Sequence, residues 1–314
     1  MSTRRTFIRQ AGLLGAISMY RRPANKMGQL GYPHNVKQTK WPDGSRLVVS
    51  ISMQFESGGQ PENAESPFPQ NMQPGFRDFP AATWYEYGYK EGIPRMLDNW
   101  DELGIKVTSH MVGGAVLKNP ALAREIVSRG HEAAAHGMNW RSQYNMTYEE
   151  EKIFIKDGAD AIKNTTGITP VGYNANWLRR GENTLTILKE LGFKYHIDDL
   201  SRDEPFLTRT KGGTLAVIPY TVRCNDIVLI EGKNFSVEQF AVQVKAEFDQ
   251  LYNEGAIRRR QMSISFHDRI GGTPQMVKTV NQLIRYMQQH EEVRFKMKKE
   301  IADIILADPD ALQE

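Results

Sequence analysis

The chain has 314 residues, of which 40% are hydrophobic and 25% are charged, and its formal net charge at pH 7 is +3. This is ordinary globular composition, and the length allows one large α/β domain or two smaller ones. The small net charge, without a basic stripe interleaved with aromatic residues, argues against a nucleic-acid partner. No stretch approaches 18 consecutive apolar residues, so the sequence predicts no membrane span.

The chain begins with MSTRRTFIRQAGLLGAISM, which combines a twin arginine with a short apolar stretch. This order is typical of a twin-arginine export signal, although no Ala-x-Ala cleavage site follows. We therefore expect residues 1–30 to be such a signal or a disordered arm and residues 31–314 to form a single domain. The expected location is periplasmic or exported, and the alternative is a cytoplasmic protein with a basic N-terminal arm.

From residue 46 onward, apolar β-rich runs alternate with helical patterns. Two expected helices open with a capping box, one formed by Thr147 and Glu150 and the other by Ser236 and Gln239. In chain order the expected elements are strand 46–55, helix 93–104, strand 106–112, helix 119–130, strand 131–136, helix 147–167, strand 170–176, helix 183–192, strands 194–198 and 216–222, helix 236–255, strand 262–267 and helix 273–293.

Repeated strand-then-helix units predict parallel strands joined by crossover helices. We expect an α/β fold, a distorted or incomplete (β/α)7 barrel, with a doubly wound open sheet as the alternative. The stretch 57–80 is rich in Pro, Gly, Gln and Asn and lacks a period. A loop of this length in a compact domain is usually a lid or an assembly element, which favours a homo-oligomer.

The active site of such a fold lies at the carboxyl ends of the strands. Polar residues follow the expected strands at this edge, which predicts a site there. They are Gln54, Glu56, His110, His136, Asn174, Asn176, Trp177, Asp198, Asp199, Asn225, Asp226, His267, Asp268 and Arg269.

The stretch GHEAAAHGMNW raises the question of a metal. The H-E-x-x-H motif fails because position 135 is alanine and the stretch reads as a strand. A second reading pairs His136 with a ligand at position 140, but this residue is Trp140. Catalytic zinc needs three protein ligands, and the first strand offers Glu56 but no aspartate. A zinc site would need an atypical third ligand, such as His267 or Asp198.

The sequence has a single cysteine and one basic triplet. Cys224 cannot form an intrachain disulfide, and we expect it to be buried as a small hydrophobic residue. The arginines at 258–260 are expected to form a solvated loop face.

Several stretches resemble the polysaccharide deacetylase (NodB-homology) family, whose members carry an Asp pair on the first strand and H-x-x-x-H after the third. The resemblance is specific to a branch with a metal-independent allantoinase analogue and cyclic-imide hydrolases, in which a Trp replaces the second His and a Glu-containing motif replaces the Asp pair. Trp140 and Gln54-Phe55-Glu56 match these replacements, whereas Ser57 and GYNANW depart from the branch. The matching stretches are QFESGGQPEN, YEYGYKEGIPRML, GHEAAAHG, AHGMNW, GITPVGYNAN, IPYTVRCND, FDQLYNEGA and MSISFHDRIGG.

The predicted catalytic residues are Glu56, His136 and His267. Glu56 is the expected general base, with burial raising its pKa, and His267 is the expected acid, oriented by Asp268 or another carboxylate. His136 would polarise the carbonyl or share the proton transfer. Arg269, Asn174 or backbone N–H groups would hold the oxyanion. The predicted substrate-binding residues are Gln54, Trp140, Asn174, Trp177, Asp198 and Arg269.

The resemblance implies a hydrolase of carbon–nitrogen bonds other than peptide bonds, which opens a cyclic amide or imide such as an allantoin-like ring without a cofactor. One alternative is a polysaccharide or peptidoglycan N-deacetylase that uses one divalent metal, zinc, with atypical ligands. The other is a non-catalytic carbohydrate-binding protein that kept the fold. The expected partner is therefore a small molecule or a glycan. Trp84, Tyr85 and Tyr87 could line the mouth of the site, an oligomer interface or the core.

Overall fold

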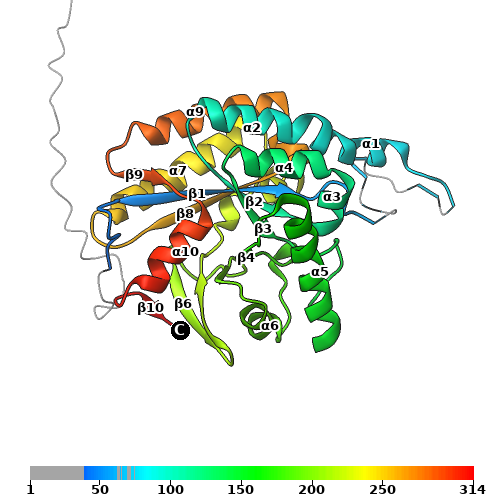
Figure 1. Cartoon of the computed structure of the whole chain (residues 1–314). Helices are drawn as coiled ribbons and strands as arrows, with labels where there is room; N and C mark the ends of the chain where they lie inside the picture. The colour runs from blue at the N-terminus through cyan, green and yellow to red at the C-terminus, as the bar shows by residue number, and fades with distance from the viewer. Residues whose placement is uncertain (1–38, 62–63, 65, 69–71, 74) are drawn as a thin grey trace, which may run out of the picture. The chain divides into compact units, whose positions relative to one another are not determined.

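The computed structural model describes residues 39–61, 64, 66–68, 72–73 and 75–314 (Figure 1). The twin-arginine segment and the predicted arm 1–30 lie outside the described residues, as does part of the stretch 57–80. Within the described part of the chain, no helix has the length and apolar character that a membrane crossing requires. The described residues from 39 onward belong to one unit.

One ten-stranded sheet forms the centre of the fold, in the order β10-β6-β7-β5-β4-β3-β2-β1-β8, with β9 beside β1. Neighbouring strands are parallel, except for the antiparallel pair β6 and β7. The predicted α/β fold is confirmed, and no ladder between described strands joins β8 to β10, so hydrogen bonds do not close the sheet into a barrel. The strands are β1 Leu47–Phe55, β2 Thr108–Met111, β3 Glu132–Ala135, β4 Gly172–Tyr173, β5 Tyr195–His196, β6 Phe206–Thr210, β7 Gly213–Val217, β8 Gln261–His267, β9 Val293–Phe295 and β10 Leu312–Gln313.

Helices join and cover the strands, and in Figure 1 α2 and α9 lie beside one another over β1. Both predicted capping boxes are present, at the starts of α5 and α7. The α-helices are α1 Phe79–Tyr87, α2 Ile93–Glu102, α3 Gly113–Lys118, α4 Pro120–Ser128, α5 Tyr148–Thr166, α6 Thr184–Glu190, α7 Val237–Gly255, α8 Asp268–Gly271, α9 Pro274–Gln288 and α10 Lys298–Ala307, and a π-helical turn η2, Gly88–Gly92, joins α1 to α2.

Two local expectations were wrong. The strand predicted at 216–222 ends at Val217, because Pro219 has no N–H to donate to a ladder. This strand, β7, begins at Gly213 and pairs with β6 in a hairpin. Arg259 and Arg260 are buried rather than solvated, and they pair with Asp308 and Glu254. The expectation for Cys224 is confirmed, since its side chain is fully buried.

The two faces of β1 differ in polarity. Val49, Ile51 and Met53 pack into the large apolar cluster that includes α2 and α9. The alternate residues Ser50 and Ser52 are also buried, and side chains of period two point to the opposite face. The barrel interior is therefore lined partly by hydroxyl groups rather than only by the branched apolar residues usual in such folds.

Lys298 projects from the start of α10 into this polar interior and is fully buried. Its Nζ donates to Ser50 Oγ at 2.9 Å and to Ser263 Oγ at 3.0 Å. The nearby Glu132 carboxylate accepts hydrogen bonds from Thr108 and Tyr195. Burial lowers the pKa of Lys298 to about 7, although the charge of Glu132 opposes this effect.

Replacing Lys298 tests whether its pKa is lowered in the folded protein, through the pH dependence of the unfolding free energy. An unfolded lysine holds its proton up to about pH 10.5, whereas folded Lys298 loses it near pH 7, so folding releases a proton between these values. The unfolding free energy contributed by this group should rise with pH across that window, by up to about 1.4 kcal/mol per pH unit. Lys298→Met should abolish the rise in chemical denaturation curves, and Lys299→Met, the neighbouring control, should retain it. If the unfolding free energy changes with pH equally in wild type and in Lys298→Met, the pKa of Lys298 is not lowered in the folded protein.

Candidate active site

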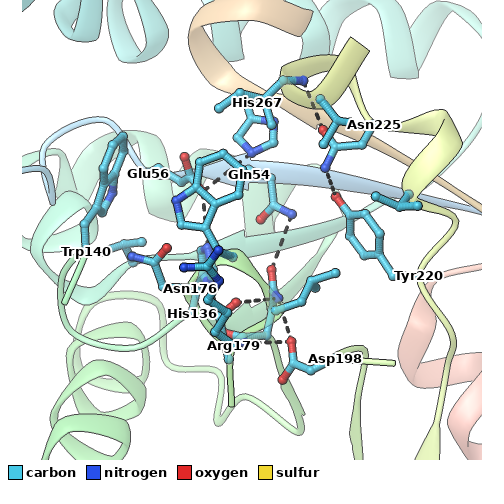
Figure 2. A pocket seen from close by; sticks show the side chains of 18 of the residues that line it. Gln54, Glu56, His136, Trp140, Asn176, Arg179, Asp198, Tyr220, Asn225 and His267 are labelled. Carbon is cyan, nitrogen blue, oxygen red and sulfur yellow. Dashed lines mark hydrogen bonds and ion pairs between the residues drawn. The ribbon is translucent and has the colours of Figure 1, made fainter. Parts of the chain in front are cut away.

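A cavity of about 470 Å³ opens at the carboxyl ends of the strands, where the sequence predicted the site (Figure 2). All of the predicted catalytic and substrate-binding residues line it. His110, Asp226 and Asp268 do not line it: His110 lies within β2, Asp226 directly precedes the segment 227–231, and Asp268 follows β8. The lining residues with predicted roles are Gln54, Glu56, His136, Trp140, Asn174, Trp177, Asp198, His267 and Arg269.

Glu56 follows β1 and is surrounded by nitrogen atoms of three side chains from two other parts of the chain. Its Oε1 lies 3.2 Å from His136 Nε2 and 3.8 Å from His267 Nε2, and its Oε2 lies 3.2 Å from Arg269 Nη1. Burial alone would raise the pKa of Glu56, but the charge of His267, the hydrogen bond from His136 and the charge of Arg269 outweigh it. The pKa is therefore held well below its ordinary value, and the expectation of a raised pKa was wrong.

His267 ends β8 and is held by a carboxylate that precedes the π-helical segment η5, Ile227–Glu231. Its Nδ1 lies 2.6 Å from Asp226 Oδ1, and its backbone N–H donates to Asp226 Oδ2 at 2.7 Å. Burial would lower the pKa of His267, but the charges of Glu56 and Asp226 outweigh burial and raise it. A raised pKa favours the protonated form of His267, which is the form that a proton donor requires.

Asp268 does not orient His267, contrary to the first of the expected alternatives. Its carboxylate accepts hydrogen bonds from the backbone N–H groups of Glu56 and Ser57 and from the Ser57 hydroxyl. Asp268 therefore fixes the backbone that carries Glu56, and Asp226 is the carboxylate that orients His267.

His136 follows β3 and is oriented from its other ring nitrogen. Nδ1 lies 2.7 Å from the carbonyl oxygen of Asn174, which can only accept, so Nδ1 carries a proton and Nε2 faces Glu56. Asp198 Oδ1 in turn accepts from the Asn174 amide and from the backbone N–H of Ala175, both at 2.9 Å. Burial raises the pKa of Asp198 to about 6, although these hydrogen bonds oppose the shift.

The rim of the cavity contains a strained segment. Trp177 and Leu178 both line the cavity with positive φ, 53° and 59°. Left-handed backbone at two adjacent residues other than glycine is costly and persists where surrounding structure enforces it, often at functional sites. Trp177 is 59% exposed, so its indole is accessible to a substrate entering the cavity.

Other lining residues had no predicted role. Arg179, Tyr220, Ile227 and Val228 contribute to the walls. Tyr220 lies within the strand predicted at 216–222, and no sequence signal distinguished it from a core tyrosine. Asn225 was among the strand-end candidates, and its amide donates to the Tyr220 hydroxyl at 2.7 Å.

The side chains around Glu56 do not form the three-ligand set of a catalytic zinc site. No group of three or more His, Cys, Asp or Glu side chains suited to a metal occurs among the described residues. The nearest donors are Glu56, His136 Nε2 at 3.2 Å from it and His267 Nε2 at 3.8 Å from it, and Trp140, which stands where the sequence motif would have a further ligand, cannot bind a metal. The Arg269 guanidinium lies against Glu56 and would repel a divalent cation there.

Comparisons by sequence find proteins that are similar to this chain. The polysaccharide deacetylase family model matches residues 77–196. A Schizosaccharomyces pombe protein named as a polysaccharide deacetylase is 25% identical over 88% of this chain and 94% of its own length. A peptidoglycan deacetylase of Helicobacter pylori is 26% identical over 68% of this chain and 84% of its own length.

Comparisons of structure agree. A crystal structure described as a polysaccharide deacetylase of Pseudomonas aeruginosa and the crystal structure of Puue allantoinase each superpose with a TM-score of 0.81 at 29% identity. Each match covers 89% of this chain and 97% of the other. The chain is therefore similar to members of the polysaccharide deacetylase family over most of its length, and these likenesses support a hydrolase that acts on carbon–nitrogen bonds.

Removing the charge of Asp226 should change the pH profile in a defined direction. Because Asp226 helps to raise the pKa of His267, Asp226→Asn should lower this pKa and move the alkaline limb of the rate profile to lower pH. At pH 8 we expect kcat to fall about 100-fold, within the range typical of general acid catalysis. The exposed control Asp157→Asn should keep the wild-type profile. An unmoved alkaline limb in Asp226→Asn would exclude His267 as the acid.

Proposed function

We propose that the protein hydrolyses a cyclic amide or imide, such as an allantoin-like ring, without a metal ion. The single observation that carries the proposal is Glu56, an ionised carboxylate in contact with His136, His267 and Arg269 at the end of the cavity. This arrangement contains a proton acceptor, a proton donor and a fixed cation. The likeness to Puue allantoinase supports the same substrate class.

The reaction begins with attack of water on the ring carbonyl. Glu56 accepts one proton from the water as its oxygen bonds to the carbonyl carbon. The low pKa makes Glu56 a weak base, but it also keeps the carboxylate ionised over the whole physiological pH range. Arg269 Nη1 is the donor next to the carboxylate that can stabilise the developing oxyanion, and His136 Nε2 can donate as well when the ring is protonated, because Nδ1 already carries a proton.

Collapse of the tetrahedral intermediate breaks the carbon–nitrogen bond. His267 gives its Nε2 proton to the leaving nitrogen, and the ring opens to a carboxylic acid and an amine or amide. Glu56 is then protonated and His267 neutral, and the separation of 3.8 Å between them allows the proton to return to His267. The net change is the addition of one water molecule across the bond.

A cyclic substrate suits this chemistry. Strained cyclic amides and imides are better electrophiles than acetamides, so they depend less on a Lewis acid, which supplies several kcal/mol in unactivated cases. A cavity of about 470 Å³ lies in the range typical of small-molecule sites.

Metal-dependent deacetylation of a glycan is the second candidate, and the likeness to the Helicobacter pylori peptidoglycan deacetylase favours it. The twin-arginine stretch also favours a substrate outside the cytoplasm, and we propose an exported protein on that ground. A protein that binds carbohydrate without turnover is the third candidate. Turnover of any substrate would exclude it.

Glu56→Gln tests the proposed base. The variant keeps the size of the side chain but cannot accept a proton, so kcat on a cyclic imide should fall by about 100-fold or more. Glu149→Gln, an exposed position on α5, should retain the wild-type rate. Full activity in Glu56→Gln would end the proposal.

Metal analysis separates the first two candidates. Purified protein should contain no stoichiometric zinc, and treatment with a chelator should leave the hydrolysis rates of a panel of cyclic amides and imides unchanged. One tightly held zinc, with activity lost on chelation and recovered on adding zinc back, would favour the glycan deacetylase instead.

A further inference from the structure

Arg269 lies inside an aromatic cage formed by Trp84, Tyr85 and Trp140. The guanidinium carbon is 5.0, 5.2 and 5.1 Å from the centres of these rings, respectively. Tyr85 and Trp140 also meet edge to face, with ring centres 5.4 Å apart. A cation over several aromatic faces is attracted by each of them, most strongly where water is excluded, and Arg269 is 3% exposed.

The cage joins parts of the chain that are distant in sequence. Trp84 and Tyr85 belong to α1, Trp140 follows β3, and Arg269 belongs to α8. The turn η2 approaches α8 so closely that a Cβ on Gly92 would overlap the backbone of Asp268. This close approach fixes α1 beside Arg269.

The caged guanidinium lies against the reacting carboxylate, with Nη1 3.2 Å from Glu56 Oε2. Trp140 stands at the position where a metal ligand was sought in the sequence, and its ring now contacts a cation instead. The positive charge next to Glu56 is therefore carried by an arginine, where a metal site would have a metal ion, and aromatic rings fix its position.

We propose that the aromatic cage is a positioning element that holds Arg269 against Glu56 for catalysis. The inference rests on the proposed hydrolysis of a cyclic amide or imide. In this role the cage determines how fast bound substrate reacts, because a displaced guanidinium no longer orients Glu56 or faces the oxyanion. Trp140 and Arg269 line the cavity together with many other residues that can bind substrate, so loss of the cage should change kcat more than KM.

Two substitutions of Trp140 test the role. Trp140→Ala removes one wall of the cage, and we expect kcat to fall 10- to 100-fold with KM within about twofold of wild type. Trp140→Phe keeps an aromatic face, and it should retain kcat within about threefold. Arg269→Lys should behave like Trp140→Ala, since an ammonium cannot replace a planar guanidinium between several rings.

Tyr89→Ala is the matched control for the loss of an aromatic ring. Tyr89 lies in η2 but packs against Lys118 rather than Arg269. Its removal should lower the melting temperature without lowering kcat. If Trp140→Ala also lowers the melting temperature and leaves kcat unchanged, the cage has only a structural role and the inference is overturned.

An NMR measurement tests the geometry without any substrate. In wild type and Trp140→Phe, the Nε–H proton of Arg269 should be shifted by the ring currents and exchange slowly, and Arg269→Lys identifies the signal by its loss. The shift should shrink in Trp140→Ala, and an unshifted signal in wild type would overturn the cage. If wild type hydrolyses no cyclic amide or imide, the proposed function fails and the catalytic role fails with it. Turnover that Trp140→Ala leaves unchanged overturns the positioning role alone.

Discussion

The structure of the site depends on one constraint, which is the cost of burying the negative charge of Glu56. A buried carboxylate stays ionised only when opposite charges and hydrogen bonds compensate for the water it has lost. His136, His267 and Arg269 supply this compensation; His136 follows β3, whereas His267 and Arg269 lie at the junction of β8 and α8. The same groups that stabilise the charge are those that the reaction needs.

Each of these nitrogen groups is held in place by a second interaction. Asp226 orients His267, the carbonyl of Asn174 orients His136, and the aromatic cage surrounds Arg269. These supports differ because the groups differ: an imidazole ring is oriented through its second nitrogen, whereas a planar guanidinium also stacks on aromatic faces. A pocket built in this way is organised before substrate arrives, which is the condition for electrostatic catalysis.

Sequence patterns predicted most of what depends on local interactions. The capping boxes at Thr147 and Ser236 involve residues three apart, and both are present. The rule that active sites lie at the carboxyl ends of parallel strands correctly predicted residues that line the cavity. Patterns were less reliable where Pro219 ended a strand early and where distant acids neutralised buried arginines.

The sequence by itself determined the order of most strands and helices between β1 and α9, the family resemblance, the candidates at the strand ends and the presence of tryptophan where a metal ligand would stand. Only the tertiary structure decided that Asp226 rather than Asp268 orients His267, that the pKa of Glu56 is lowered, and that Trp140 contacts a guanidinium. The reason is physical. Electrostatic effects depend on through-space distances, and the partners of Glu56 lie 80 or more positions away in the chain.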